Sequence, residues 1–145
     1  MDFSEGLLLL TNDGELANHL LHPRYQHKKV YQVRLRGKVK NEELKPMREG
    51  QLLQDATKLL PADVKIVKRT DQFTLIEIVL RQGINRQIRK MCENLGLTVL
   101  SLKRVEVAGL KLGNLEPGKW RRLTKDEILK LKDLKKAASC KDSCI

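Results

Sequence analysis

Aromatic side chains are scarce in this chain, at 3% of its 145 residues, and it carries only three cysteines. Scarce aromatics argue against a stacking platform for long single-stranded nucleic acids, and they leave the core to aliphatic side chains. The cysteines are too few and too unevenly placed for a disulfide framework. Cys92 lies on the apolar side of a predicted helix, where it should fill the core. Cys140 and Cys144 lack further ligands nearby, and the histidines are unevenly spaced, so we expect no metal site.

Long apolar runs are also missing. No stretch approaches the roughly 20 residues that a membrane-spanning helix requires. The N-terminus lacks the basic region of a secretory signal, and the apolar run from Leu7 to Leu10 is too short for one. These absences predict a cytoplasmic protein that has no membrane partner. The length is that of one domain, and a hydrophobic content of 41% is typical of a globular protein.

Basic residues, in contrast, are abundant. The chain has 29 Lys and Arg against 18 Asp and Glu, which gives a net charge of +11. Such an excess favours a polyanionic partner, and the alternative is a charge that only keeps the protein soluble. Clustering of the basic residues favours the nucleic-acid interpretation. The clusters are Lys28, Lys29, Arg34, Arg36, Lys38 and Lys40; Arg81, Arg86, Arg89 and Lys90; and Lys103, Arg104, Lys119, Arg121 and Arg122.

The hydrophobic pattern predicts more strands than helices. Alternation of apolar and polar residues is typical of a half-buried strand, and a short apolar run is consistent with a buried one. The outer face of the strand over residues 30–37 is basic. The predicted strands cover residues 7–10, 30–37, 62–68, 73–80 and 97–107, with a turn at 70–72 and a short strand in the loop over 110–120.

Helices are predicted from their caps and their apolar spacing. Asn12, with Glu15 three residues later, should cap a helix that ends near His22, and a short helix from Asn41 should end or distort at Pro46. The clearest helix has Asn85 as its cap and Gly96 just after its end. A Thr124–Glu127 capping box starts the last helix. We therefore predict a single α+β domain with a mixed, largely antiparallel sheet and a few packed helices.

Two sets of residues could carry chemistry. Arg86 and Arg89 are three residues apart near the start of the predicted helix, where two arginines and the positive helix end would bind an anion. The alternative is a solvated basic face. Tyr31 points inward from its strand, so it belongs either to the core or to a site, and a buried hydroxyl needs a partner.

Four segments together resemble one family. They are Gly6–Leu16, Lys29-Val30-Tyr31, Gly83–Cys92 and Gly118–Thr124. Over roughly residues 2 to 130, the chain resembles the RNA pseudouridine synthases of the small bacterial type that modify ribosomal RNA. The resemblance implies a pseudouridine-synthase-like fold, isomerisation of a specific uridine in ribosomal RNA to pseudouridine, and no metal or organic cofactor.

The resemblance also implies roles for particular residues. Arg89 ends the family's Gln-Ile-Arg motif, so it inherits the pairing with the catalytic aspartate. Tyr31 inherits the place of the tyrosine that packs against the target uracil. The family's aspartate ends a Gly-Arg-Leu-Asp motif, and counting back from Gly6 puts that position on Met1, one residue before Asp2. Either Asp2 is the nucleophile with a shortened loop, or the chain begins inside the motif. We assign the catalytic roles to Asp2, Tyr31 and Arg89.

The expected partner is ribosomal RNA, bound by a monomer. Residues 1–136 should form the catalytic domain, lacking its N-terminal part, and residues 137–145 a flexible tail. One alternative is a truncated, inactive RNA-binding domain of the same fold, and another is a basic ribosome-associated protein unrelated to modification. The residues expected to contact RNA are Arg34, Arg36, Asn85, Arg86, Lys90, Lys103 and Arg104.

Overall fold

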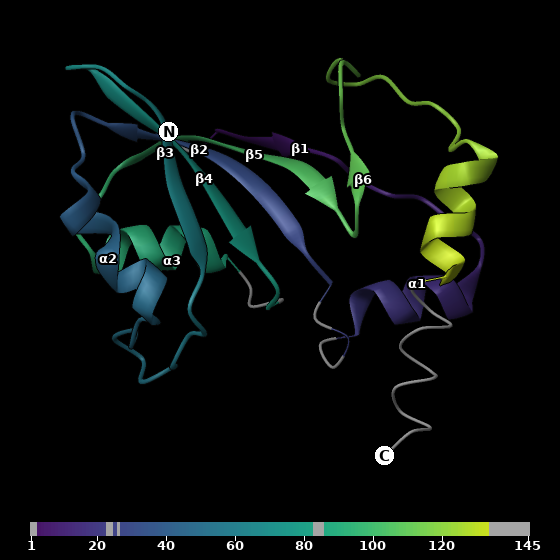
Figure 1. Cartoon of the computed structure of the whole chain (residues 1–145), viewed down its shortest axis with the longest axis horizontal. Coiled ribbons are helices and arrows are strands. Elements are labelled where there is room, and N and C mark those ends of the chain that lie inside the picture. The colour runs from purple at the N-terminus through teal and green to yellow at the C-terminus, as the bar shows by residue number, and fades with distance from the viewer. Residues whose placement is uncertain (1–2, 23–24, 26, 83–85, 134–145) are drawn as a thin grey trace.

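The computed structural model of the chain describes residues 3–22, 25, 27–82 and 86–133 (Figure 1). A single mixed sheet runs through the molecule, with helices at both of its ends. In chain order, the elements are β1 (Phe3–Gly6), α1 (Gly14–Leu21), β2 (Lys29–Arg36), α2 (Asn41–Glu49), β3 (Asp63–Arg69), β4 (Phe73–Leu80), α3 (Gln87–Asn94), β5 (Val99–Val107), β6 (Leu110–Lys111) and a last helix over residues 125–133.

The sheet is largely antiparallel. Its strands follow the order β1-β5-β2-β4-β3, and β6 pairs with the end of β5. Only β1 runs parallel to its neighbour, β5, while the other described pairs are antiparallel. The predicted α+β class with a mixed sheet is therefore confirmed. The strands predicted over residues 30–37, 62–68, 73–80 and 97–107 are β2, β3, β4 and β5, with ends that differ by at most two residues.

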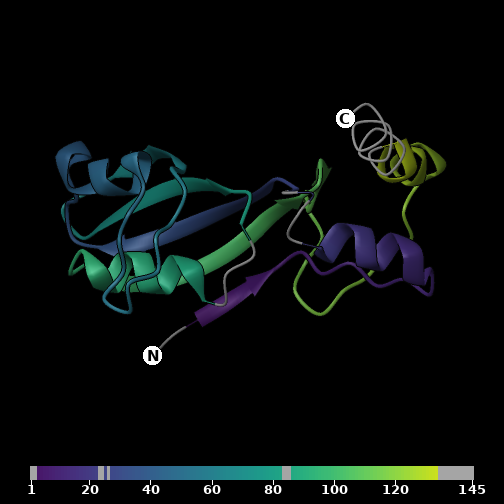
Figure 2. The same ribbon diagram turned by 90° about the horizontal axis from the view of Figure 1, so that it is seen from below.

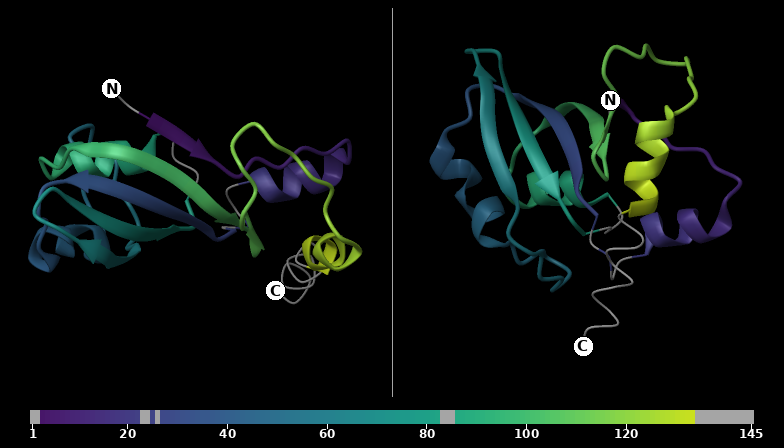
Figure 3. Two further views of the ribbon diagram at one scale, coloured as in Figure 1. Left: turned by 90° about the horizontal axis from the view of Figure 1, so that it is seen from above. Right: turned by 45° about the vertical axis from the view of Figure 1, so that its right-hand side comes forward.

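Two hydrophobic clusters lie at the two ends of the sheet. The major core packs β2 and β4 against α2 and α3, and Leu35, Leu44 and Met91 are among its fully buried side chains. The minor core gathers Leu16 of α1, Leu110 of β6 and other residues around the last helix. Figure 2 shows this division, because α2 and α3 lie at one end of the ribbon and α1 with the last helix at the other. Figure 3 shows the same separation from two further sides.

The strand predicted at Leu7–Leu10 is wrong. The β-pairing occurs earlier, in β1, and it ends at Gly6. The leucine run is extended, with Leu7 and Leu9 against the minor core, whereas Leu8 and Leu10 are 70% and 85% exposed. Packing with the minor core, rather than a sheet neighbour, therefore accounts for Leu7 and Leu9 but not for the exposed Leu8 and Leu10.

Two helix starts differ from the prediction. Asp13, not Asn12, caps α1, and its Oδ1 accepts a hydrogen bond from the Leu16 N–H at 3.1 Å. Lys40 precedes α2 without a side-chain cap. The Asn41 Oδ1 instead accepts a bond from Arg48 Nη2 at 3.0 Å, so that side chain is used elsewhere in the helix.

Helix α2 also continues through Pro46 to Glu49, whereas we predicted that it would end or distort at Pro46. Pro46 removes one backbone hydrogen bond, but Leu44 and Met47 on either side of it are fully buried. Burial of two such side chains contributes about 1.5–3 kcal/mol each, which offsets the loss. Among the described residues, no helix has both the length and the apolar character that crossing a membrane requires.

Candidate active site

The sheet has two unlike faces, set by the alternation of side chains along β2 and β4. Val33, Leu35 and Ile78 point into the major core, and we call this side the core face. Arg34 and Glu77 lie on the other side, the outer face. Since cross-strand partners share a face, the register assigns each strand residue to one side. The core face is the side on which α2 and α3 pack.

One row of the core face crosses the sheet through Gly6, Arg104, Tyr31 and Ile78, on β1, β5, β2 and β4. Ser4 lies in the adjacent row, two residues earlier on β1. Neighbouring strands are about 4.8 Å apart, so Tyr31 is roughly 10 Å from β1 across the intervening strand. Tyr31 is half-buried and packs against the major core. A tyrosine ring and the start of the chain are thus brought to one face.

Gly6 permits β1 to approach β5 closely. A Cβ atom at this position would lie 2.5 Å from the Arg104 nitrogen and 2.7 Å from its carbonyl oxygen. Its φ of 144° is also one that other residues rarely adopt. The first glycine of the Gly6–Leu16 segment is therefore required by packing at the edge of the site.

Arg104 holds Leu7, the residue after β1, through hydrogen bonds. Its Nε and Nη2 donate to the Leu7 carbonyl oxygen at 2.9 and 2.5 Å, and the Leu7 N–H donates to the Arg104 carbonyl at 2.8 Å. We predicted an RNA contact for Arg104. The structure gives its guanidinium an acceptor within the protein, on the core face beside Tyr31.

Arg89 reaches the same face from α3. It is only 7% exposed, and its Nη2 donates a hydrogen bond to Ser4 Oγ on β1. The solvated basic face considered from the sequence is thus wrong for Arg89, although Arg86 is exposed. Burial of Ile88 and Met91 in the major core draws the first turn of α3 onto the sheet and carries Arg89 with it.

The start of α3 has an unusual backbone. Arg86 holds the position before the helix with φ 53° and ψ 33°, in the left-handed region, and it makes no side-chain cap bond. Such a conformation costs a non-glycine residue about 1 kcal/mol or more, and strained residues gather at functional sites. Asn85, which we predicted as the cap and as an RNA contact, lies outside the described residues. Asp2, the predicted nucleophile, does too.

The structure divides the remaining predicted RNA contacts. Arg34, Arg36 and Lys103 lie on the outer face, opposite Tyr31 and Arg89. They cannot line one pocket with those two residues. Strand alternation sends them to the opposite side of the sheet, and their contact with RNA stays a prediction.

One outer-face cation already has an aromatic neighbour. The Arg34 Cζ lies 4.3 Å from the centroid of the Phe73 ring, and Lys68 Nζ lies 5.9 Å from the same centroid.

Lys90 is half-buried on α3, and its charge contributes to the lowered pKa of Asp55, after the hydrogen bonds from Thr57. Lys90 therefore faces the loop after α2 rather than the row of Tyr31.

The three histidines gather where spacing along the chain did not predict it. The His19 and Tyr25 rings stack with centroids 3.9 Å apart, and His27 Nε2 is 3.1 Å from His19 Nδ1. His22 meets the edge of the Tyr25 ring. Burial and the neighbouring His19 lower the pKa of His27. Within the described ranges, no three His, Cys, Asp or Glu side chains are arranged to hold a metal ion.

Cys92 is a core residue, as predicted. It is fully buried, and burial raises the pKa of its thiol to about 12. The thiolate form is therefore negligible near neutral pH, which excludes Cys92 as a nucleophile.

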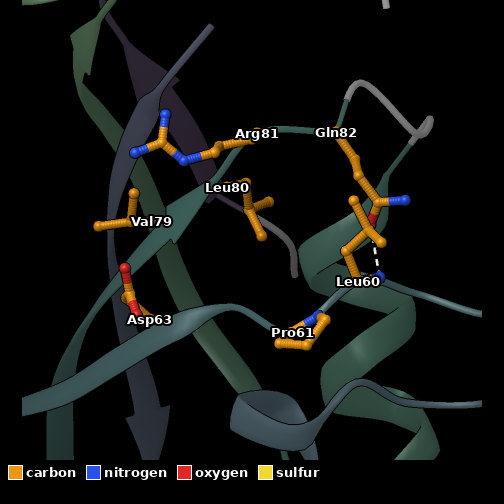
Figure 4. Close-up of a pocket in the computed structure, with 7 residues that line it drawn as sticks. All are labelled: Leu60, Pro61, Asp63, Val79, Leu80, Arg81 and Gln82. Atoms are coloured by element: carbon orange, nitrogen blue, oxygen red, sulfur yellow. Dashed lines mark hydrogen bonds between the residues drawn. The ribbon is translucent and has the colours of Figure 1, made fainter. Parts of the chain in front are cut away.

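Two cavities lie away from Tyr31 and Arg89. Figure 4 shows the smaller one, of about 70 Å³, beside the end of β4, where the Leu60 N–H donates to Gln82 Oε1 at 2.9 Å. Gln87 Nε2 also donates to that oxygen, at 3.2 Å, so Gln82 ties α3 to β4. The larger cavity, of about 950 Å³, is lined by residues 5–11, by leucines of the minor core such as Leu16 and Leu110, and by residues 115–123. Neither of these cavities is lined by Tyr31 or Arg89.

Comparison with known proteins gives a consistent result. The family model for RNA pseudouridylate synthase matches residues 2–94. An uncharacterized RNA pseudouridine synthase of Aquifex aeolicus is 43% identical over 128 residues, which cover 88% of this chain and 51% of that protein. Ribosomal large subunit pseudouridine synthase B of Bacillus subtilis is 40% identical over 133 residues, covering 90% and 54%.

The fold comparison agrees. A crystal structure of a pseudouridylate synthase superposes with a TM-score of 0.79 at 31% identity, over 87% of this chain and 54% of that one. The chain therefore spans about half the length of the relatives it matches.

Proposed function

The chain belongs to the RNA pseudouridylate synthase family, and from that premise we propose that it isomerises a uridine of ribosomal RNA to pseudouridine. The observation that carries the proposal is that Tyr31 and Arg89, which bonds to Ser4 of β1, lie on the same core face of the sheet. Ribosomal RNA is the substrate class because a relative that is 40% identical is a ribosomal large subunit pseudouridine synthase.

The reaction breaks the bond between uracil N1 and the ribose, turns the base, and joins its C5 to the same ribose carbon. C5 then loses its proton and N1 gains one, so substrate and product are isomers and the reaction needs no cofactor. A carboxylate suits this chemistry, since it can attack the substrate or stabilise a cationic sugar as charge develops. We propose Asp2 for this role. It precedes Ser4, the residue that Arg89 contacts, by two positions in the sequence.

Arg89 would keep such a carboxylate ionised and oriented. A guanidinium can bind a carboxylate through two parallel hydrogen bonds, and these favour the charged form. Tyr31 would pack against the target uracil, and its hydroxyl would assist removal of the C5 proton. The base must leave its stack to reach this face, since chemistry on a base requires its extrusion. Replacement of Arg89 should therefore affect the step that needs the carboxylate, and replacement of Tyr31 should affect binding of the uracil and removal of the C5 proton.

Binding of the rest of the RNA is electrostatic in this proposal. Arg86 is exposed at the start of α3 and suited to a phosphate contact, with Asn85 and Lys90 as its neighbours. Arg34, Arg36 and Lys103 would hold RNA on the outer face, away from the chemistry. Arg104 would act by fixing β1 rather than by touching RNA. The protein would work as a cytoplasmic monomer.

The test is pseudouridine formation in ribosomal RNA transcripts, measured by nucleoside chromatography. The chain, Asp2→Asn and Asp13→Asn are compared, since Asp13 only caps α1 and serves as the control. We expect turnover by the chain and by Asp13→Asn, and none by Asp2→Asn. Equal turnover by Asp2→Asn would remove Asp2 from the mechanism. RNA binding without turnover by the chain would favour the inactive RNA-binding alternative.

A further inference from the structure

Lys29 opens β2 two residues before Tyr31, on the same face of the sheet. Its cross-strand partners are Leu80 on β4 and Val107 on β5, both buried. The side chain is therefore half-buried at the end of the core face, next to the Tyr31–Arg104 row. Two residues along a strand span roughly 6.8 Å.

The charge of Lys29 is not balanced within the described residues. No carboxylate there forms an ion pair with it, and the charge that lowers its pKa is the like charge of Arg104. Burial first, and then Arg104, lower the pKa of the Lys29 amine. Lys28 differs, because its Nζ lies 3.6 Å from a carboxylate oxygen of Glu106. Two adjacent lysines thus have opposite environments.

Partial burial of an unpaired ammonium costs free energy, so its presence is not explained by stability. An uncompensated cation beside a proposed catalytic ring instead indicates a site for an anion that arrives with the substrate. Arg104 cannot supply the same function, because Leu7 already accepts its hydrogen bonds. A lysine ammonium has three donors and no fixed plane, which suits a single phosphate.

We propose that Lys29 binds a backbone phosphate of the target nucleotide while Tyr31 receives its base. The proposal rests on the proposed function, because it takes the place of the base from that reaction. The strand spacing between the two residues is comparable to the distance from a nucleobase to its own phosphate. Lys29 would then help to hold the extruded nucleotide, as a binding residue with no part in the bond changes.

The experiment compares Lys29→Met, Lys29→Arg and the matched control Lys28→Met in the full chain, with a uridine-containing ribosomal RNA transcript. Lys29→Met should bind about tenfold more weakly, which corresponds to about 1.4 kcal/mol. Its slope of log affinity against log salt should fall by about one unit. Lys29→Arg should keep most of the affinity, and Lys28→Met should match the original chain. In turnover, Lys29→Met should raise KM more than it lowers kcat.

Thermal melting without RNA supplies the second readout. Lys29→Met should raise Tm, since methionine fills similar space without an unpaired charge, whereas a merely structural lysine would lower Tm on removal. A Lys29→Met chain with unchanged affinity and salt slope overturns the proposal, even if the chain and Lys28→Met both modify RNA. If the original chain itself neither binds nor modifies the transcript, the proposed function fails and this proposal fails with it.

Discussion

At the scale of the residue, the site depends on side chains whose burial is hard to foresee. Arg89 lies off the apolar stripe of its helix, so its removal was expected to cost little packing. In the structure it is buried and bonded to Ser4. An arginine in such a place stabilises the fold through its stem as well as its charge.

Arg89→Met should therefore abolish pseudouridine formation and also lower Tm. Arg89→Lys should keep the charge and most of the stability but lose much of the rate, because an ammonium cannot reproduce bidentate hydrogen bonding. Arg86→Met is the control for helix effects, since Arg86 is exposed. Turnover and melting are measured together on all three variants. Full activity of Arg89→Met would remove Arg89 from the reaction.

Tyr31→Phe separates the ring from the hydroxyl. The ring packs against the major core, so the fold should persist with almost the same Tm. The rate should fall by about 10²-fold or more if the hydroxyl assists removal of the C5 proton, which is the usual contribution of general acid–base catalysis. Single-turnover measurement gives this rate directly. A rate that does not change would leave the ring as a packing element alone.

At the scale of the element, local sequence patterns predicted most strands of the sheet, but two predictions failed, one for a strand and one for the end of a helix. Alternation along residues 30–37 and 73–80 placed β2 and β4, because each strand has one buried face. The strand predicted at Leu7–Leu10 was wrong, since a short apolar run shows that side chains can be buried but not which kind of element buries them. The prediction at Pro46 failed because burial of Leu44 and Met47 outweighs the low helix propensity of proline.

The approach of β1 to β5 makes a sharp prediction. Gly6→Ala should lower the free energy of unfolding by at least about 3 kcal/mol, because the added Cβ meets backbone that cannot move away. Gly113→Ala is the matched control, with a φ of 61° but no atom within 4 Å of an added Cβ. That change should cost about 1 kcal/mol. Urea unfolding measures both, and equal losses would contradict the close approach.

The histidine cluster, which joins α1 to the start of β2, should make stability depend on pH. Burial and His19 lower the pKa of His27 below its model-compound value of 6.5. The folded state therefore binds fewer protons than the unfolded state just below pH 6.5, so stability is full above that pH and decreases as pH falls. The urea midpoint should drop between pH 7.5 and 5.5. In His27→Gln this part of the drop should disappear, and an unchanged profile would exclude His27 as its cause.

At the scale of the whole molecule, composition predicted a polyanionic partner but not how the charge is arranged. The sequence showed that Arg34 and Arg36 share a side of their strand. It could not show that Tyr31 and Arg89 would share the other side, because the place of Arg89 depends on the path of α3 back over the sheet. Long-range packing of this kind has no local signal, and only the family motifs pointed to it.

The arrangement of charge leads to a prediction for RNA binding. With a net charge of +11, log affinity should fall with log salt at a slope of several units. Replacing Arg34, Arg36 and Lys103 with glutamine removes three outer-face cations and should reduce that slope by up to about three units if this face holds RNA. Replacing Lys45, Lys125 and Lys130 lowers the net charge equally at exposed helical positions and is the control.

Titrations of a ribosomal RNA transcript from 50 to 300 mM salt would measure the three slopes, at roughly the range where counterion release dominates. A larger slope reduction for the outer-face variant assigns RNA to that side of the sheet as well as to the core face. Equal reductions would mean that net charge alone attracts RNA and that the outer face has no distinct part. A flat salt dependence of the original chain would contradict electrostatic binding altogether, because each phosphate that a cation neutralises releases a counterion.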